Sequence, residues 1–188
     1  INAFKESCKN EAIVWQGQTF TYEWILSKYQ NWLSLLKENN VKEGTVVIVE
    51  ADFSPNSVAL LLALIDHSCI FVPITSSVGS KRTEFITTAQ GEMLIKIDSS
   101  DEFNIEELSG NADHEIYKKL IKTGHPGLVL FSSGSTGKSK ASVHDITGIL
   151  EKFKVKRHSL RTITFLLYDH IGGFNTLLYT LSNTGFIV

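Results

Sequence analysis

The sequence lacks the features that would assign it to several common protein classes. It has only two cysteines, Cys8 and Cys69, among 188 residues, which is too few for a disulfide framework. Its formal net charge of −2 gives no electrostatic reason to expect nucleic acid or an acidic membrane as a partner. No apolar run approaches the length of a membrane span, and no secretory signal opens the chain. We therefore expect a reducing, cytoplasmic setting, with no nucleic-acid partner and no membrane span.

The composition is ordinary for a globular protein with a buried core. Hydrophobic residues make up 43% of the sequence and charged residues 20%. The length suits one large domain, which we expect over residues 1–188. The chain starts at Ile1, its only methionine is Met93, and it ends in GFIV, a run typical of the beginning of a strand. An unpaired apolar strand end is a poor natural terminus, so we expect a fragment of a longer protein.

One segment, residues 152–161, is strongly basic and reads KFKVKRHSLR. Lysine and arginine runs are usually solvated loops or helix ends, and we expect that here. A binding patch is the alternative.

The first third of the chain predicts a parallel βαβ unit. Residues 22–40 carry the clearest helical pattern, because apolar side chains recur there at spacings of three and four after a suitable N-cap, Thr21. Around this helix we expect a hairpin at 12–21, strands at 45–49 and 70–74, and a helix at 56–67 that Ser54 caps and Pro55 opens. A strand, a helix and a second strand in this order build a parallel sheet.

The rest of the chain continues this alternation. We expect helices at 80–90, 113–122, 146–153 and 174–181, and strands at 93–97, 128–131, 140–144 and 162–167. Asp113 and Asp145 are expected helix caps, and Gly124 is an expected helix end. Residues 98–111 are polar and acidic and are expected to be a surface excursion. The pattern predicts an α/β fold.

The stretch LVLFSSGSTGKSK, residues 128–140, carries the strongest chemical signal. A short apolar strand is followed by glycines, hydroxylated residues and two lysines. Glycine lets a backbone approach a ligand closely, and hydroxyl and ammonium groups donate hydrogen bonds to anionic oxygens. Such a loop at a strand end suits a triphosphate.

Two kinds of phosphate loop compete for this stretch. The Walker A motif, G-x-x-x-x-G-K-[ST], fits Gly137, Lys138 and Ser139, but it requires glycine where Ser132 stands. It also requires a helix directly after the lysine. The residues KASVH alternate in polarity instead, which predicts a second strand.

The stretch resembles much more closely the phosphate loop of the adenylate-forming (AMP-binding) superfamily, which includes acyl-CoA synthetases and peptide-synthetase adenylation domains. The residues that match its signature are Ser132, Ser133, Gly134, Ser135, Thr136, Gly137, Lys138 and Lys140. The departure is Ser139, where proline is usual. The earlier phrases Thr21-Tyr22, 44–47 and Val72-Pro73 are similar to the superfamily's opening, so the resemblance covers the whole chain.

A second motif of the superfamily resembles the residues YDHIGG, which follow the strand expected at 162–167. The resemblance places His170 beside the acyl or aryl substrate as a catalytic and substrate-binding residue, and it assigns to Gly172 a close approach to the substrate. Without the resemblance, a histidine at this position would more often be a packed or helix-capping residue. The distance of His170 from the phosphate loop in the sequence favours the substrate-binding role instead. Asp169 could either orient His170 or cap the following helix.

The resemblance implies a three-layer, Rossmann-like, mostly parallel sheet flanked by helices, as the N-terminal subdomain of an adenylate-forming ligase. It implies ATP and Mg²⁺, a carboxylic acid substrate, and a thiol acceptor that is CoA or a carrier-protein phosphopantetheine. The loop would bind phosphates, and the rest of the enzyme's own chain would supply the adenine- and Mg²⁺-binding loop, the ribose-binding Asp and a terminal lysine. The fragment alone should therefore not turn over. A divergent P-loop kinase or NTPase, and a non-catalytic relative used as an interaction module, remain the alternatives.

Overall fold

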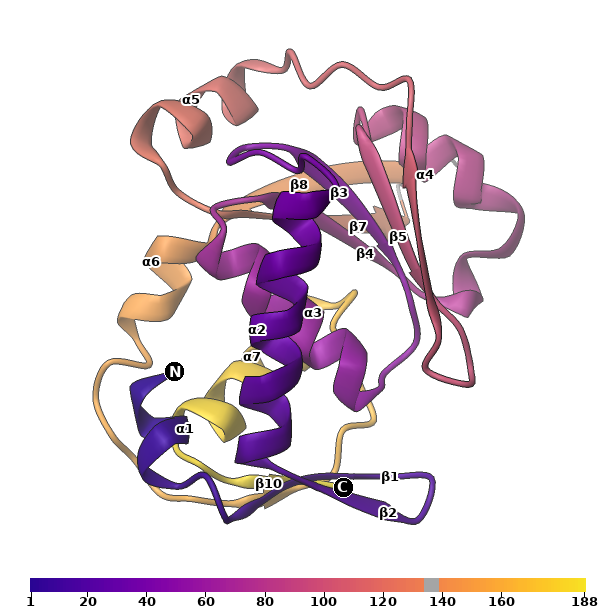
Figure 1. The fold of residues 1–188 in the computed structure, drawn as a ribbon. Helices are drawn as coiled ribbons and strands as arrows, with labels where there is room; N and C mark the ends of the chain where they lie inside the picture. Colours follow the sequence, from indigo (N-terminus) through magenta and orange to yellow (C-terminus); the bar gives the residue numbers. More distant parts are fainter. Residues whose placement is uncertain (134–138) are drawn as a thin grey trace.

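The computed structural model describes residues 1–133 and 139–188, with the backbone alone at Ser133. Its larger sheet has six strands in the order β6-β5-β3-β4-β7-β8 (Figure 1). The strands are β3 (Val46–Glu50), β4 (Ile70–Ile74), β5 (Met93–Ile97), β6 (Phe103–Glu107), β7 (Gly127–Ser133) and β8 (Ser139–Asp145). The four central strands run parallel, and the two edge strands are antiparallel to their neighbours. The expected mostly parallel sheet is confirmed.

Helices cover both faces of this sheet, because its central strands are apolar on both sides. In β3, Val47 and Val49 pack with one set of helices, whereas Val46 and Ile48 pack with the other. The first set is α2 (Tyr22–Glu38), α3 (Pro55–Asp66) and α7 (Ile171–Ser182), and the second is α4 (Arg82–Thr88) and α5 (Glu115–Thr123). This arrangement confirms the three layers (Figure 1).

A second sheet, which the sequence did not predict, lies beyond α2 and α7 (Figure 1). Its strands, in the order β2-β1-β10-β9, are β1 (Glu11–Trp15), β2 (Gln18–Thr21), β9 (Arg161–Thr162) and β10 (Phe186–Ile187). The expected hairpin around Gly17 is confirmed as β1 and β2. The Tyr22 hydroxyl donates to the carbonyl of Gly185 at 2.7 Å, which fixes the start of α2 against the chain just before β10.

Three of the four expected helix caps are confirmed. Thr21 accepts a hydrogen bond from the Trp24 amide, Ser54 caps α3 ahead of Pro55, and Asp145 caps α6 (Ile146–Glu151). The remaining helices are α1 (Asn2–Glu6) and the 3₁₀ segment η1 (Ser76–Lys81). The expected cap at Asp113 is wrong: His114 Nδ1 accepts from the Ile116 amide, because the Asp113 carboxylate is engaged by Gln90.

Residues 98–111 lie at the surface as expected, but they contain β6, whose alternating pattern leaves Ile105 half-buried and its polar neighbours exposed. One further expectation is wrong. Residues 162–167 do not form a buried strand, since β9 ends at Thr162, and Ile163 and Phe165 are 71% and 83% exposed. β9 and its neighbour β10 pair over only two residues, and the side chains of Ile163, Phe165 and Leu166 remain exposed.

Candidate functional site

A pocket of about 360 Å³ lies where β4 and β7 end, on the edge at which open α/β sheets bind ligands. Residues from segments far apart in the sequence surround it. They are Pro73, Ser77, Val78, Ser80, Lys81, Phe85, Phe131, Ser132, Ser139, Asp169 and His170.

The two ends of the phosphate loop form one wall of this pocket. β7 and β8 pair antiparallel as far as Ser133 and Ser139, so the loop is the connection of a β-hairpin. Helix α4 holds this hairpin, because Glu84 Oε1 accepts from the Ser139 amide at 3.0 Å and the Phe85 ring stacks on Phe131 with centroids 3.9 Å apart. The expected strand after Lys138 is confirmed as β8, which removes the helix that a Walker A loop requires.

The predicted loop residues divide into three groups. Ser132 lines the pocket, and Ser133 ends β7. Gly134, Ser135, Thr136, Gly137 and Lys138 lie outside the described residues. Lys140 is exposed on β8, opposite Ser132, and does not line the pocket.

The opposite wall carries His170, which also lines the pocket. It is the N-cap residue of α7, but its side chain makes no capping hydrogen bond and is 64% exposed. Gly172 lies in the first turn of α7, and a Cβ there would meet only the flexible Leu166 side chain at 3.2 Å. The tightest approach is at Gly173, which sequence reasoning did not single out. A Cβ there would lie 2.0 Å from the Leu167 carbonyl oxygen.

Asp169 does not cap α7; its carboxylate lies between the two walls. Oδ2 accepts from Thr75 Oγ1 at 2.9 Å, and Thr75 Oγ1 is also 2.7 Å from Ser77 Oγ. Oδ1 is buried without a hydrogen-bond partner among the described residues and lies 3.9 Å from His170 Nε2. A buried carboxylate oxygen in this state can accept a hydrogen bond from a ligand.

Tyr168 anchors this wall to the sheet. Its hydroxyl is 2.8 Å from the Ala51 carbonyl oxygen and 2.7 Å from that of Asp52, both just beyond β3. Burial raises the pKa of the Tyr168 phenol well above its ordinary value, so the group remains a neutral donor.

Tyr168→Phe is expected to lower the free energy of unfolding by about 0.5–1.5 kcal/mol, because the buried carbonyl of Ala51 and the partly buried carbonyl of Asp52 lose their donor. Urea unfolding measures this change. The matched control is Tyr179→Phe, whose hydroxyl has no partner within the described part of the chain, and it should stay within about 0.5 kcal/mol of the parent. Equal losses in the two variants would contradict the anchoring role.

Several pocket residues escaped the sequence analysis. Ser77 and Ser80 lie in η1, the segment after β4, and Lys81 is the N-cap residue of α4. The signal was present in the run TSS at 75–77, because polar residues that leave the carboxyl end of a parallel strand are placed toward a ligand.

Within residues 1–133 and 139–188, no group of three or more His, Cys, Asp or Glu side chains is placed to hold a metal ion. Over the same residues, no helix combines the length and apolarity that crossing a membrane requires.

A model of the AMP-binding enzyme family matches residues 2–188. Among curated proteins, the chain is 27% identical over 190 residues to the hybrid PKS-NRPS synthetase xenE of Xenoacremonium sinensis, covering 92% of this chain and 5% of that protein. It is 25% identical over 154 residues to bacitracin synthase 3 of Bacillus licheniformis, covering 73% of this chain and 2% of that protein. The chain therefore spans only a small part of these relatives.

Among solved structures, the chain is similar to the Klebsiella oxytoca NpsA N-terminal subdomain in complex with 3-hydroxyanthranilyl-AMSN. The TM-score is 0.74 at 18% identity, covering 99% of this chain and 51% of that one. It is also similar to VinN, with a TM-score of 0.71 at 16% identity, covering 100% of this chain and 54% of that one. These likenesses show the fold.

Proposed function

Because this chain belongs to the AMP-binding enzyme family, which its sequence matches over residues 2–188, we propose that it forms part of an enzyme that activates a carboxylic acid with ATP. The products of this step are an acyl adenylate and pyrophosphate. A thiol then takes the acyl group and releases AMP.

One observation carries the proposal. Ser132 and Ser139, at the two ends of the phosphate loop, line the same pocket as His170, which reaches it from a distant segment. Two motifs separated in the sequence thus meet at the carboxyl edge of the parallel sheet. A nucleotide phosphate and an acid substrate bound at these two walls would lie next to each other, as the reaction requires.

In the proposed reaction, a carboxylate oxygen attacks the α-phosphorus of ATP, and the bond to the β-phosphate oxygen breaks. The hydroxyl, amide and ammonium groups of residues 132–140 hold the β- and γ-phosphates, which stabilises the charge that moves onto pyrophosphate. Mg²⁺ enters with ATP as part of the nucleotide substrate. His170 donates a hydrogen bond to the acid and positions it, and Gly172 allows the acid to approach α7 closely.

The proposed acceptor is the phosphopantetheine thiol of a carrier protein, in preference to CoA. The support comes from the relatives, several of which are hybrid PKS-NRPS synthetases, and from a related structure described as an artificially fused Adenylation-PCP di-domain NRPS from Klebsiella oxytoca. We also propose that adenine and ribose are bound by a continuation of this chain, since the chain covers about half of the related NpsA subdomain.

Product analysis of the full-length protein tests the proposal. With ATP, Mg²⁺ and a panel of carboxylic acids, we expect pyrophosphate to form only when the correct acid is present. Continued turnover to AMP and pyrophosphate should also require a thiol acceptor. ADP and phosphate would favour a kinase or NTPase. No nucleotide turnover with any acid would favour a non-catalytic relative.

His170→Ala is expected to lower kcat/KM for the acid about 10- to 100-fold, because a hydrogen bond to a charged group is worth about 1.5–3 kcal/mol. The KM for ATP should change less than about threefold, and the free energy of unfolding by less than about 0.5 kcal/mol, because the exposed ring makes no capping bond. Steady-state kinetics and urea unfolding measure these effects.

The matched control is His158→Ala, which removes an exposed histidine outside the pocket and should leave all three quantities unchanged. An unchanged kcat/KM in His170→Ala would remove this residue from the proposed site.

A further inference from the structure

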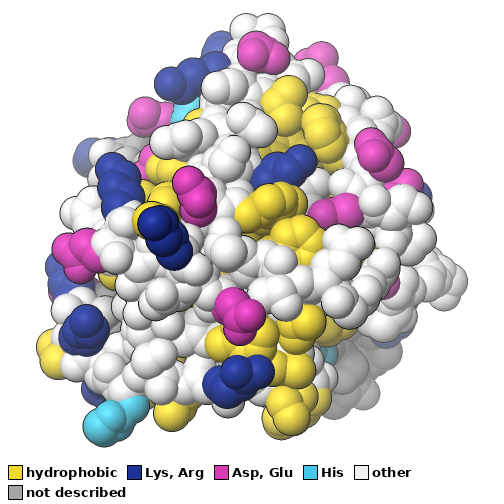
Figure 2. Space-filling view, turned by 60° about the horizontal axis from the view of Figure 1, so that its bottom comes forward, with side chains coloured by type: hydrophobic (Ala, Val, Ile, Leu, Met, Phe, Trp, Pro, Cys, Tyr) yellow, Lys and Arg dark blue, Asp and Glu magenta, His cyan; other side chains and the backbone are white. Residues whose placement is uncertain are grey.

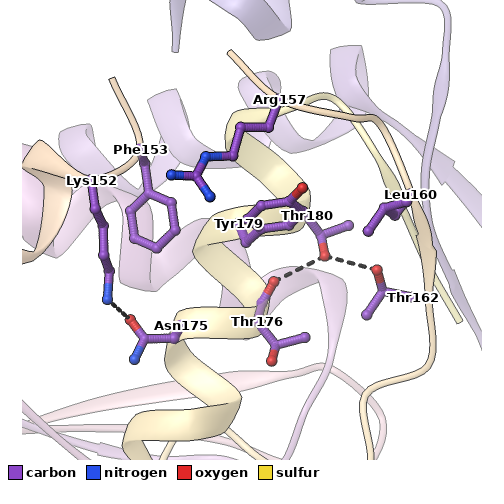
Figure 3. Close-up of a pocket in the computed structure, with 9 residues that line it drawn as sticks. All are labelled: Lys152, Phe153, Arg157, Leu160, Thr162, Asn175, Thr176, Tyr179 and Thr180. Carbon is purple, nitrogen blue, oxygen red and sulfur yellow. Dashed lines mark hydrogen bonds between the residues drawn. The ribbon is translucent and has the colours of Figure 1, made fainter. Parts of the chain in front are cut away.

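The basic segment at residues 152–161 folds beside α7 and lines a second cavity, of about 430 Å³, that is open to the surface (Figure 3). None of its lining residues lines the candidate site. They are Lys152, Phe153, Arg157, Leu160, Thr162, Asn175, Thr176, Tyr179 and Thr180. The volume falls in the range of roughly 300–1,000 Å³ that is usual for small-molecule sites.

The wall of this cavity is fixed by hydrogen bonds, although the basic segment is largely exposed. The Arg157 amide donates to Asn183 Oδ1 at 2.5 Å, and Ser159 Oγ donates to the Thr184 carbonyl at 3.1 Å. The Leu160 carbonyl accepts from the Phe186 amide at 2.8 Å. The expectation of a merely solvated loop is therefore incomplete, because three successive contacts hold the segment against the end of α7 and the start of β10.

The polar side chains that face the cavity differ in whether they already have a hydrogen-bond partner. Thr180 Oγ1 lies 2.9 Å from the Thr176 carbonyl and 3.0 Å from Thr162 Oγ1, so these hydroxyls already have partners (Figure 3). Lys152 Nζ donates to Asn175 Oδ1 at 2.5 Å. The Arg157 guanidinium has no hydrogen-bond or ion-pair partner among the described residues, and no carboxylate lines the cavity.

Phe153, Leu160 and Tyr179 form the apolar walls of the cavity. Both cationic side chains lie near the Phe153 ring: Lys152 Nζ is 5.1 Å from its centre, and Figure 3 shows the Arg157 side chain extending toward it. Arginine binds carboxylates and phosphates in a bidentate manner, and aromatic walls favour a flat or apolar body.

We propose that this cavity binds a small organic anion, whose carboxylate or phosphate is held by Arg157 and Lys152. The apolar body of the ligand lies against Phe153, Leu160 and Tyr179. The site is separate from the proposed adenylation site and does not depend on that function.

Titration calorimetry of the full-length protein without ATP tests the proposal, with phenyl phosphate and benzoate as probes. We expect at least one of them to bind, and the comparison between them tells whether the site prefers phosphate or carboxylate. Benzyl alcohol, which lacks the charge, and inorganic phosphate, which lacks the ring, should bind at least tenfold more weakly. Arg157→Gln should weaken binding of the preferred probe tenfold or more.

The matched control is Lys156→Gln, which removes one charge from the same basic segment at an exposed residue that does not line the cavity. It should bind the preferred probe within twofold of the parent. Lys138→Ala, in the phosphate loop, should do the same. Equal losses in Arg157→Gln and Lys156→Gln would mean unspecific charge attraction, and a loss confined to Lys138→Ala would place the probe at the phosphate loop. Either result would overturn the proposal, and so would the failure of both phenyl phosphate and benzoate to bind.

Discussion

Lys138→Ala is expected to lower the rate of acid-dependent adenylate formation by about 10²–10³-fold in the full-length protein, the usual loss when one group that stabilises developing charge is removed. The lysine ammonium would neutralise charge on the β- and γ-phosphates as pyrophosphate leaves. Transfer of the acyl group from a preformed acyl adenylate to the thiol involves no pyrophosphate, so it should stay within about threefold. Single-turnover measurements of the two half-reactions separate these effects.

Thr136→Ala should change the two half-reactions in the same direction as Lys138→Ala, with a smaller loss because a neutral hydroxyl donor is removed. Lys119→Ala is the matched control, since this lysine is exposed on α5, away from the pocket. Equal losses in adenylation and thiol transfer would contradict the assignment of the loop to the leaving phosphates.

Gly173→Ala is expected to lower the free energy of unfolding by about 3 kcal/mol, the upper part of the usual range for an overpacked site. A Cβ at this position would lie 2.0 Å from the Leu167 carbonyl oxygen and 2.4 Å from that of Leu166. Both obstacles are backbone atoms, which cannot rotate away as a side chain does. The start of α7 must therefore move, and His170 moves with it. Urea unfolding and the rate of adenylate formation measure the two consequences.

The control for this substitution is Gly148→Ala in α6, where a Cβ meets nothing within 4 Å. Since alanine favours a helix over glycine by about 1 kcal/mol, this variant should be as stable as the parent or slightly more stable. A Gly173→Ala protein with parental stability would show that the contact between α7 and residues 166–167 relaxes at little cost.

Local signals in the sequence were enough to predict much of the larger sheet. The cap at Ser54, the proline after it and the apolar runs on either side of α3 specify a βαβ unit without knowledge of distant residues. The polar alternation after Lys138 likewise predicted the strand that became β8. Periodicity and capping act within a few residues, so they can be read from the chain directly.

The second sheet could not be predicted in this way, because its pairing joins opposite ends of the chain. Ile13 pairs with Ile187, and nothing in either short run indicates the other. The same limit explains the error at residues 162–167: apolar character indicates that a run can be buried, but the neighbouring strand decides whether it is. Figure 2 shows hydrophobic side chains exposed in several patches on the face seen from the side of the smaller sheet.

The candidate site shows a similar division. Its two motifs were visible as patterns in the sequence, and the fold places Ser132 and His170 at one pocket. The bond from Thr75 to Asp169 joins two loops that follow separate segments, and its donor and acceptor carry no mutual signal in the sequence. From the sequence, Asp169 could therefore either orient His170 or cap the following helix, and only the fold places its carboxylate against Thr75.

The most direct test of the proposed activation is exchange of labelled pyrophosphate into ATP by the full-length protein. Because adenylation is reversible, label should enter ATP when the correct carboxylic acid is present, without any thiol, and should not enter when the acid is omitted. Exchange that is independent of acid, or ATP consumption that yields ADP with no exchange, would contradict carboxylate activation at this site.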